Sequence, residues 1–600
     1  MQNKAHLEAD HFLNNETQFH LGMLPTEQAN PKTRNLDKIF AESTREGVKA
    51  LMSVDMDIYP MAQKVFTGKE YDKLVKAGVK AISDGKKIIF SGCGATGRLS
   101  ILLESFWRCF FRDLHQEYPD IYEKVKHVEN SVFSIMTGGD YALIRAVEYF
   151  EDYQEFGRQQ ARELIVIEGD ILVAITEGGE TSSVLGTLTE AADRGAEVFL
   201  MFNNPADILC KHIERSRKAI EDPRVTVLDL FCGPMAIAGS TRMQATTSEQ
   251  LIAGAALESI LGGYFRELLS AEELELLNIR ETDYAEAYNE MLSELLSGQN
   301  PEIVGEYIQM EKNTYQENGL VTYYGNTLML DIFTDTTERS PTFMLPPFRK
   351  YDDTVSPPSW AYVKNPLLPT PEAWVNVLER APRCLEWDAK LYRKMNAPQA
   401  LISDPPLLDI SQILKFQIGN DEDNSRISKK PNVAVNVISR VEISRPEFEN
   451  YQAAFNEAAE KYQGKSAMII GTCDEAANYK ISCSPQNSVF NLMDRLAVKI
   501  VLNTVSTGTM VVMGRVLGNW MSWVDVTNKK LKDRGIRLIS DICGISYRDA
   551  CYALHESLEE LKSFNVSSGE KPSPVQYTIN RIGLPGRSDI GLAGEKIGNL

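Results

Sequence analysis

Turns in the first half of this chain carry the residue types that bind a phosphate. The first turn, residues 91–97, reads Ser-Gly-Cys-Gly-Ala-Thr-Gly after a short apolar run. A glycine-rich turn that opens a helix presents unpaired backbone N–H groups and the positive end of the helix dipole to an anion. The glycines permit the tight path, and the threonine adds a hydroxyl. We therefore expect Gly94, Ala95 and Thr96 to contact a phosphate.

Two further turns offer the same chemistry. Residues 176–183 follow a second apolar run and open another helix, and residues 239–243 precede a third. Turns at the carboxyl ends of parallel strands meet at one edge of a sheet. Glu177 and Glu180 would repel a phosphate there unless they are turned outward or paired. The residues of these turns that we expect to bind the substrate or its phosphate are Thr176, Glu177, Gly178, Thr181, Ser240, Thr241 and Arg242.

The elements that must position these turns alternate between strand and helix. Apolar runs at 86–91, 170–175, 197–202 and 225–230 are expected to be strands, and 70–84 reads as a helix. This alternation predicts a doubly wound α/β sheet. Ligands of such sheets bind outside the carboxyl ends of the strands, where the first two turns lie.

A second strand–turn–helix cassette occupies residues 320–330, more than 200 residues after the first. A repeat of that length indicates two related domains rather than a solenoid. Two such domains can pair face to face and build one site from unequal halves. The predicted fold is therefore α/β, with two doubly wound parallel-sheet domains and a helical C-terminal region.

The domain boundaries follow from these patterns. Residues 1–50 are expected to form an arm and a helix, 51–290 the first domain, 291–500 the second domain, and 501–600 a helical region with a loose tail. A stretch rich in proline and tryptophan, 344–406, interrupts the second domain. Its aromatic content favours an ordered excursion over a disordered linker.

The composition narrows the classes of partner. A net charge of −20 argues against nucleic acid and against an anionic membrane. No run approaches the ~20 apolar residues of a membrane helix, and the N-terminus lacks the apolar core of a signal peptide. Nine cysteines show neither a CxxC pair nor a zinc spacing. We expect a cytoplasmic protein with reduced thiols and no cofactor or metal; a dinucleotide is disfavoured because no acidic partner for its ribose is evident.

Several segments resemble one family of the sugar isomerase (SIS) fold, which joins bacterial N-acetylmuramic acid 6-phosphate etherase and animal glucokinase regulatory protein. The most specific are Gly-Ser-Thr-Arg-Met at 239–243 and Val-Leu-Asn-Thr-Val-Ser-Thr-Gly at 501–508. The resemblance implies SIS-type, flavodoxin-like domains. Two such units in one chain look like the regulatory protein, since the etherase has one unit per chain and dimerises. The other resembling segments are 26–37, 92–99, 137–152, 335–343 and 499–508.

The resemblance also assigns residues. The etherase removes lactate from a sugar-phosphate ether, which needs a base beside a carbonyl and an acid for the departing oxygen. By resemblance these two groups are Glu151 in the first domain and Glu338 in the second. Lys499 and Arg242 are the cations expected at the phosphate. Phe106 stands where the etherase has its acid, so the resemblance implies one competent site per chain.

The main functional expectation is a binding protein for a hexose 6-phosphate or amino-sugar 6-phosphate that senses carbohydrate metabolism as the glucokinase regulator does. A sugar kinase is then a possible partner. The alternative is an etherase-like lyase that releases lactate, and an enzyme assignment stays open between the two. A third reading, an aldose–ketose isomerase, is the weakest, because ring opening often uses a histidine and none of the seven histidines lies in a phosphate-loop motif.

Overall fold

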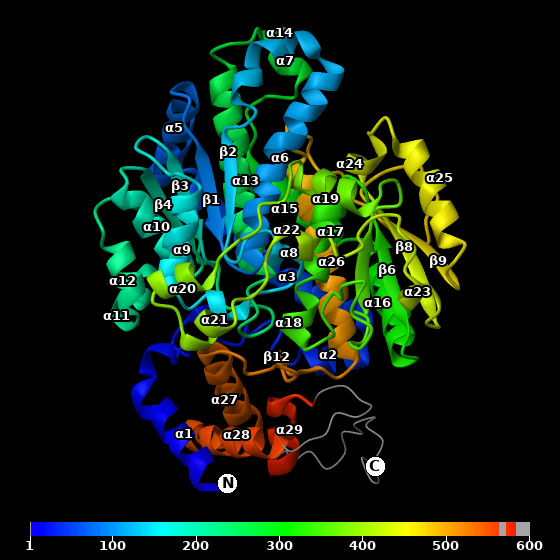
Figure 1. The fold of residues 1–600 in the computed structure, drawn as a ribbon. Helices are drawn as coiled ribbons and strands as arrows, with labels where there is room; N and C mark the ends of the chain where they lie inside the picture. Colours follow the sequence, from blue (N-terminus) through cyan, green and yellow to red (C-terminus); the bar gives the residue numbers. More distant parts are fainter. Residues whose placement is uncertain (1, 563–571, 584–600) are drawn as a thin grey trace.

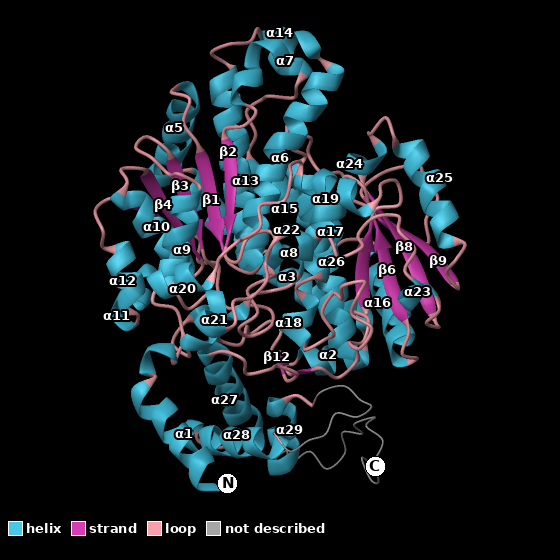
Figure 2. Ribbon diagram, in the orientation of Figure 1, coloured by secondary structure: helices cyan, strands magenta, loops and turns pink. Residues whose placement is uncertain are grey.

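The computed structural model describes residues 2–562 and 572–583. Two five-stranded parallel sheets stand side by side with long helices between them, and a smaller helical cluster lies below both (Figures 1 and 2). We call the first sheet with its helices the first unit and the second sheet with its helices the second unit. The predicted fold class, two parallel-sheet α/β domains with a helical C-terminal region, is confirmed.

The strands of the first unit all precede residue 230, and those of the second unit all follow residue 319. The first sheet consists of β1 (Ile88–Gly92), β2 (Val132–Met136), β3 (Ile171–Ile175), β4 (Glu197–Phe202) and β5 (Val225–Asp229). The second consists of β6 (Leu320–Tyr324), β7 (Ala361–Lys364), β8 (Asn432–Ile438), β9 (Gly464–Ile470) and β10 (Tyr479–Ile481).

Both sheets have the same topology. The first runs β2-β1-β3-β4-β5, and the second runs β7-β6-β8-β9-β10. Both are the 2-1-3-4-5 order of flavodoxin-like sheets, in which ligands bind at the switch point next to the first strand. In the first unit that point lies between β1 and β3, where the first two predicted turns begin.

Long helices cover the sheets and explain the apolar strand sequences. Every residue of β1, β3 and β6 is buried, as expected for strands of a parallel sheet with helices on both faces. At the centre, α13 (Gln244–Phe265) packs against α26 (Leu492–Val512). Of the described helices, α26 is the one that is long and apolar enough to cross a membrane by length and composition, and 94% of its apolar window is buried inside the protein.

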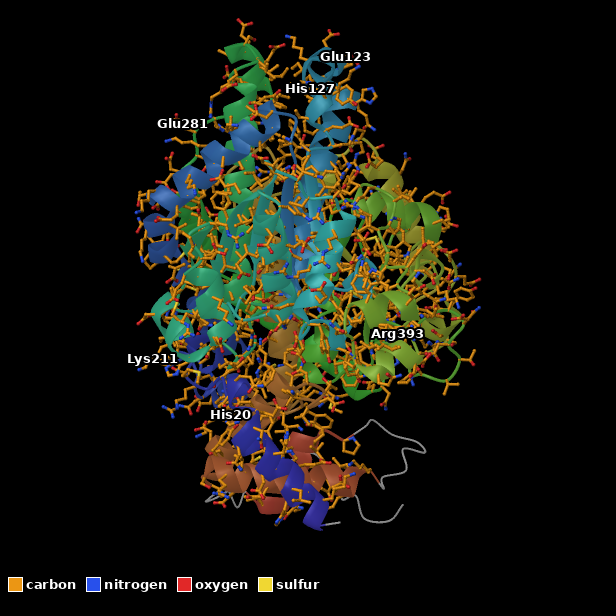
Figure 3. All side chains as sticks on the ribbon, turned by 60° about the vertical axis from the view of Figure 1, so that its left-hand side comes forward. His20, Glu123, His127, Lys211, Glu281 and Arg393 are labelled. Atoms are coloured by element: carbon orange, nitrogen blue, oxygen red, sulfur yellow. The ribbon has the colours of Figure 1, made fainter. Side chains whose placement is uncertain are left out.

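The helical cluster joins the two ends of the chain (Figure 1). It contains α1 (Gln2–Asn15), α27 (Lys529–Cys543), α28 (Tyr547–Leu561) and α29 (Pro574–Ile582), and α1 packs on α28. In Figure 3, His20 marks the level where this cluster meets the two units, and His127 lies near the opposite end of the molecule.

Three details differ from the sequence analysis. The edge strand β2 follows a charged segment and was not expected. The proline- and tryptophan-rich stretch 344–406 supplies β7, so part of it belongs to the second sheet rather than to an excursion. The helix α29 lies in the tail that we expected to be loose; the rest of that tail, 563–571 and 584–600, lies outside the described residues. The domain boundaries remain a proposal, and the one at 500 falls inside α26.

Candidate functional site

The turn after β1 opens α6 (Ala95–Glu117) at the switch point of the first sheet. A Cβ on Gly92 would lie 2.3 Å from the carbonyl carbon of Thr96, so only glycine allows the helix to approach the strand this closely. Gly94 has φ 57° and ψ −122°, and a Cβ there would meet open space. In the described structure no acceptor faces the backbone N–H groups of residues 94–97. The turn therefore leaves a helix N-terminus open for an anion.

Thr96 shapes this turn from within. Its hydroxyl accepts a hydrogen bond from the backbone N–H of Cys93 at 3.0 Å and donates one to the Cys93 carbonyl at 2.9 Å. The side chain is buried. The predicted contact between this hydroxyl and a phosphate would have to replace bonds that the turn already uses, whereas Gly94 and Ala95 stay half-exposed.

The turn after β3 is fixed by its own carbonyl groups. The carbonyl of Glu177 accepts from the backbone N–H of Asn203 at 2.9 Å. The carbonyl of Gly178 accepts from the Asn204 amide at 3.0 Å. At the end of the turn, the hydroxyl of Thr176 donates to that of Thr181 at 3.0 Å. The turn thus holds a fixed shape where it opens α10 (Ser182–Asp193).

The two carboxylates of this turn have opposite surroundings. Glu180 is paired with Arg215 at 2.8 Å and with Lys530 at 2.6 Å. Burial by itself would raise the pKa of Glu180, but Lys530 and Arg215 lower it to about 2. Burial raises the pKa of Glu177 to about 7, and Glu338 and Glu180 act in the same direction against Lys530. Glu180 is therefore neutralised by its partners, and Glu177 is not.

The turn at 239–243 joins the two units. Arg242 is buried and donates to Asp335 at 2.9 Å, to the Ser506 hydroxyl at 2.9 Å and to the Thr507 hydroxyl at 2.7 Å. All three acceptors belong to the second unit. Ser240 is buried and Thr241 half-buried beside it. The predicted phosphate cation Arg242 therefore has its terminal nitrogens engaged in holding the units together.

Lys499 supports the same turn from α26. Its ammonium donates to the carbonyls of Arg242 (2.9 Å) and Met243 (3.3 Å), to the Thr247 hydroxyl (2.9 Å) and to the Asn503 amide oxygen (2.9 Å). Burial lowers the pKa of Lys499 to about 8. An ammonium has three donors, so these acceptors already saturate it. The geometry assigns Lys499 a supporting position behind the turn rather than a contact with an anion.

Glu338 comes from the second unit and reaches the first turn. It precedes α18 (Arg339–Phe343), and its carboxylate forms an ion pair with Arg98 on the first turns of α6. Arg98 is fully buried and also donates to the Leu143 carbonyl at 2.9 Å. The sequence analysis did not single out Arg98, although it lies in the segment that carried the resemblance. This pair brings the predicted second-unit glutamate to the predicted phosphate turn.

Glu151 lies beside the start of α10, where its backbone carbonyl accepts from the N–H of Ser183 at 3.0 Å. It follows the 3-10 helix η4 (Glu148–Phe150) and precedes α9 (Gln154–Glu163), so it stands in the turn between them. The Asn528 amide donates to its carboxylate at 3.0 Å. Trp387, from the proline- and tryptophan-rich stretch, stacks on Phe150 with 5.7 Å between ring centres. That stretch therefore braces the segment that carries Glu151.

The helical cluster contributes two groups that the sequence analysis missed. Asn528 caps α27 and contacts Glu151, and Lys530 binds Glu180. The positive charge of Lys530 also acts on Glu177 and Glu151. No spacing pattern could have found these contacts, since they join residues about 350 positions or more apart.

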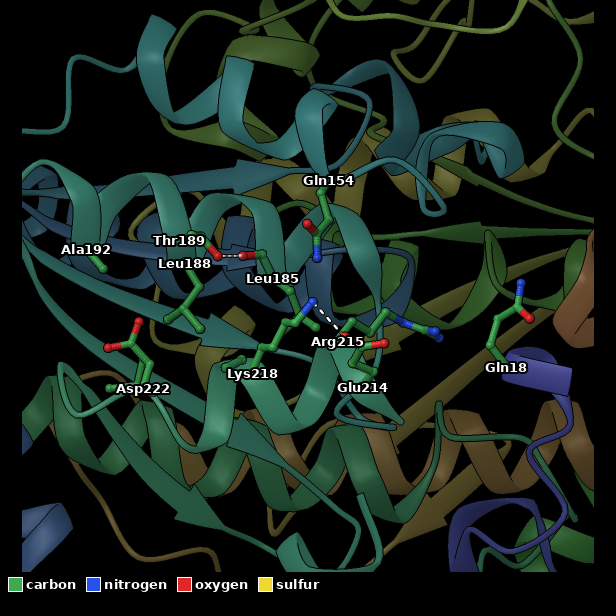
Figure 4. Close-up of a pocket in the computed structure, with 12 residues that line it drawn as sticks. Gln18, Gln154, Leu185, Leu188, Thr189, Ala192, Glu214, Arg215, Lys218 and Asp222 are labelled. Atoms are coloured by element: carbon green, nitrogen blue, oxygen red, sulfur yellow. Dashed lines mark hydrogen bonds and ion pairs between the residues drawn. The ribbon is translucent and has the colours of Figure 1, made fainter. Parts of the chain in front are cut away.

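A separate cavity lies behind the second turn. It has a volume of about 510 Å³, and Figure 4 shows Arg215, Lys218 and Thr189 among the residues that line it. Arg215 is shared with the site through Glu180, but neither Glu151 nor Glu338 lines this cavity. Among the described residues no group of three or more histidine, cysteine, aspartate or glutamate side chains could hold a metal ion.

Comparison with known proteins identifies the relatives. A family model described as the glucokinase regulatory protein N-terminal SIS domain matches residues 71–192. The N-acetylmuramic acid 6-phosphate etherase of Clostridium acetobutylicum is 30% identical over 237 residues, covering 39% of this chain and 67% of the etherase. The etherase 1 of Bacillus licheniformis is 28% identical over 233 residues, with 39% and 67% covered.

A solved structure also aligns with this chain. Tagatose-6-phosphate ketose/aldose isomerase from Escherichia coli aligns with a TM-score of 0.38 and 10% identity, covering 80% of this chain and 96% of that one. The similarity to etherases contradicts our main functional expectation, a regulator-like binding protein, and favours the alternative that we stated beside it.

Proposed function

Because the chain belongs to the SIS-domain family that joins N-acetylmuramic acid 6-phosphate etherase and glucokinase regulatory protein, we propose that it is a carbon–oxygen lyase. Its substrate would be a phosphorylated amino sugar that carries a lactyl ether, and its product would include lactate. The observation that carries this proposal is the 30% identity to an etherase over 237 residues.

The proposed phosphate position is the open N-terminus of α6. Backbone N–H groups of residues 94–97 point there without an acceptor in the described structure. A helix N-terminus favours an anion through its unpaired donors and its dipole. Thr181, at the start of α10, and Thr241 are half-buried and offer hydroxyls. These groups suit a phosphate in a protein whose net charge is −20.

The proposed proton transfers use the two glutamates from opposite units. A base takes the proton from the carbon beside the sugar's carbonyl. The electron pair of that carbon–hydrogen bond forms the double bond as the carbon–oxygen bond of the ether breaks. The departing lactyl oxygen keeps that bond's electron pair and takes a proton from an acid. Glu151 and Glu338 would share these two roles. Water then adds to the double bond: its hydroxide joins the carbon that lost the ether oxygen, its remaining proton goes to the acid, and the proton held by the base returns to the carbon beside the carbonyl.

Incubation with N-acetylmuramic acid 6-phosphate tests the proposal directly. Released lactate is measured in a coupled assay with the wild-type protein and with Glu338→Gln. We expect lactate from the wild type and a rate at least about 100-fold lower in the variant, the usual loss when an acid or base is removed. Glu168→Gln is the control, because Glu168 is exposed in the turn before β3, at the opposite end of that strand from the site.

Two outcomes would contradict the proposal. Absence of lactate from the folded wild type would refute the lyase, and full activity of Glu338→Gln would remove that residue from the reaction. No comparison supports the sugar-kinase partner, and it forms no part of the proposed function. The proposed location is the cytoplasm, in agreement with nine cysteines that form no disulfide.

A further inference from the structure

Glu177 stands on a turn that cannot easily move. Its carbonyl is bound to Asn203, and the next two carbonyls are bound to the side chains of Asn204 and Ser216 at 3.0 and 2.7 Å. At the far end the Glu180 carbonyl accepts from Arg215. A backbone held at each successive carbonyl fixes the direction in which the Glu177 side chain leaves it.

The Glu177 carboxyl itself has no side-chain partner among the described residues. Its own backbone N–H acts only to lower its pKa, and the residue is half-buried. Glu180, three residues later, shows the contrast, because Lys530 and Arg215 both bind it. An acidic group without a partner at the edge of an anion site is electrostatically unfavourable when it is ionised.

The charged groups that face Glu177 come from four places. Glu338 comes from the second unit, Lys530 from α27, Glu249 from α13, and Glu180 from the same turn. Burial is the largest influence on Glu177 and raises its pKa to about 7, while Lys530 and its own N–H oppose the shift. The group therefore changes charge close to neutral pH.

We propose that Glu177 makes anion binding at this site depend on pH: its carboxyl takes up a proton when a phosphate or sulfate ester enters and then donates a hydrogen bond to that ester. The inference assumes, with the proposed function, that the anion lies at the N-termini of α6 and α10. It concerns binding, and it does not require that the ligand react.

The direction of the effect follows from the charge. Below about pH 7 the neutral carboxyl is a donor, and above it the carboxylate repels an anion. The protonated fraction falls from about nine tenths at pH 6 to about one tenth at pH 8, so the affinity should fall by about tenfold over this range.

Other groups that titrate in this range lie behind the site. Burial raises the pKa of Asp55 to about 7 and lowers that of Lys499 to about 8, and both side chains are buried near the 239–243 turn. Burial also keeps the pKa of Glu249 well above its usual value. These groups are unchanged when Glu177 is replaced, so the difference between wild type and variant isolates Glu177.

The test measures binding of glucose 6-sulfate by calorimetry at pH 6, 7 and 8. A sulfate ester keeps one charge throughout, whereas a phosphate ester titrates near pH 6 and would obscure the effect. The variants are Glu177→Gln and the exposed control Glu168→Gln. We expect binding to weaken between pH 6 and pH 8 by about tenfold more in the wild type and in the control than in Glu177→Gln.

A second measurement needs no variant. Titration of the wild type at pH 7 in two buffers of different ionisation enthalpy reports proton uptake, and we expect about half a proton per ligand. The same pH dependence in Glu177→Gln, no proton uptake, or no binding at any pH would each overturn the inference. The lactate assay is independent, so a failure here and a failure of the lyase proposal are told apart.

Discussion

The two units use the same kind of turn in opposite ways. In the first unit the N–H groups of residues 94–97 meet no acceptor in the described structure. In the second unit the N–H groups of Thr327 and Leu328, which precede α17 (Met329–Thr336), donate to the carboxylate of Glu442 at 3.2 and 3.0 Å. A buried internal carboxylate lies where an external anion would lie. A duplicated fold therefore does not imply a duplicated site.

The difference arises from one pair of corresponding glutamates. Ala174 pairs with Ser91, which precedes Gly92, and Glu180 lies six residues after Ala174. In the second unit Asn436 pairs with Tyr324, which precedes Gly325, and Glu442 lies six residues after Asn436. Burial raises the pKa of Glu442 to about 7 in spite of its backbone donors, whereas cations hold that of Glu180 at about 2. In the second unit the Glu442 carboxylate, which we call the plug, occupies the helix N-terminus. In the first unit the Glu180 carboxylate is paired with cations.

The pairing of nearby cations differs between the two glutamates. In the first unit Arg215 and Lys530 bind the Glu180 carboxylate, so Glu180 is paired with side chains and not with the N–H groups of residues 94–97. In the second unit Arg440 is paired with Asp494, and Arg445 with Asp113 from the first unit. Glu442 is left with backbone N–H groups as its hydrogen-bond donors. Of these two cations, Arg215 belongs to the first unit itself, and Lys530 comes from α27 of the helical cluster.

The facing residues differ in the same sense. Glu338 faces the first turn through Arg98. The residue that the resemblance sets at the position of the etherase acid in the first unit is Phe106, which is buried with the Arg495 guanidinium 4.5 Å from its ring centre. The turn after β6 in the second unit thus lacks both an open helix N-terminus and a facing carboxylate. This supports the expectation of one competent site per chain, which remains part of the proposal.

Matched glycine variants give the largest expected contrast. A Cβ on Gly92 would lie 2.3 Å from backbone atoms of Thr96, which cannot give way without moving α6. A Cβ on Gly325 would lie 2.8 Å from the end of the Ile332 side chain, which can move. We expect Gly92→Ala to abolish lactate release and to cost about 3 kcal/mol of unfolding free energy. Gly325→Ala should cost less than about 1.5 kcal/mol and keep activity.

Lactate release and urea unfolding measure the two variants side by side. Equal losses of activity in both variants would mean that the turn after β6 contributes to the reaction as much as the turn after β1. Retained activity in Gly92→Ala would remove the first turn from the site altogether.

The sequence was a good guide to the elements and a poor guide to their charges. Apolar runs located β1, β3, β4 and β5 because buried parallel strands leave an unbroken apolar pattern. The resemblance placed Glu338 in the second unit, and the structure brings it to the first turn through Arg98. The strand β2 was missed because Ser134 interrupts its short apolar run, Val132–Met136.

Side-chain partners could not be read from spacing. Lys499 was expected at the phosphate, yet its ammonium is surrounded by carbonyl and hydroxyl oxygens of the 239–243 turn and of two helices. Asn528, Lys530 and Glu442 carry no local signal, because their roles arise only when distant segments pack. Which cation meets which carboxylate is decided by tertiary packing, and periodicity is silent on that.

Removal of the plug should have a smaller effect that an anion can reverse. In Glu442→Ala the N–H groups of Thr327 and Leu328 lose their acceptor in a buried place, which costs about 1–3 kcal/mol. Sulfate can replace the carboxylate, so we expect it to raise the melting temperature of the variant more than that of the wild type. Chloride at equal ionic strength is the reference, because sulfate also stabilises proteins in general.

A second buried carboxylate provides the control for that experiment. Glu258 accepts from the backbone N–H of Phe490 at 2.9 Å and from the Tyr284 hydroxyl at 2.8 Å, but it caps no phosphate-type turn. Glu258→Ala should lose stability without any specific gain from sulfate. Equal responses to sulfate in both variants would show that the turn after β6 is not an occluded anion site.

The pH dependence of stability gives the smallest and most discriminating contrast between the two glutamates. Glu442 has a folded pKa of about 7, above the usual value, so its contribution is present at low pH and is lost as the pH rises toward 7. Glu180 has a folded pKa of about 2, so its contribution is lost only as the pH falls below about 4.5.

Between pH 5.5 and 6.5, Glu442→Gln should therefore remove a decline of about 1 kcal/mol in unfolding free energy, whereas Glu180→Gln should leave the slope in that interval unchanged. Urea unfolding at the two pH values measures both slopes, and a slope that changes in Glu180→Gln but not in Glu442→Gln would reverse the assignment of plug and paired ion.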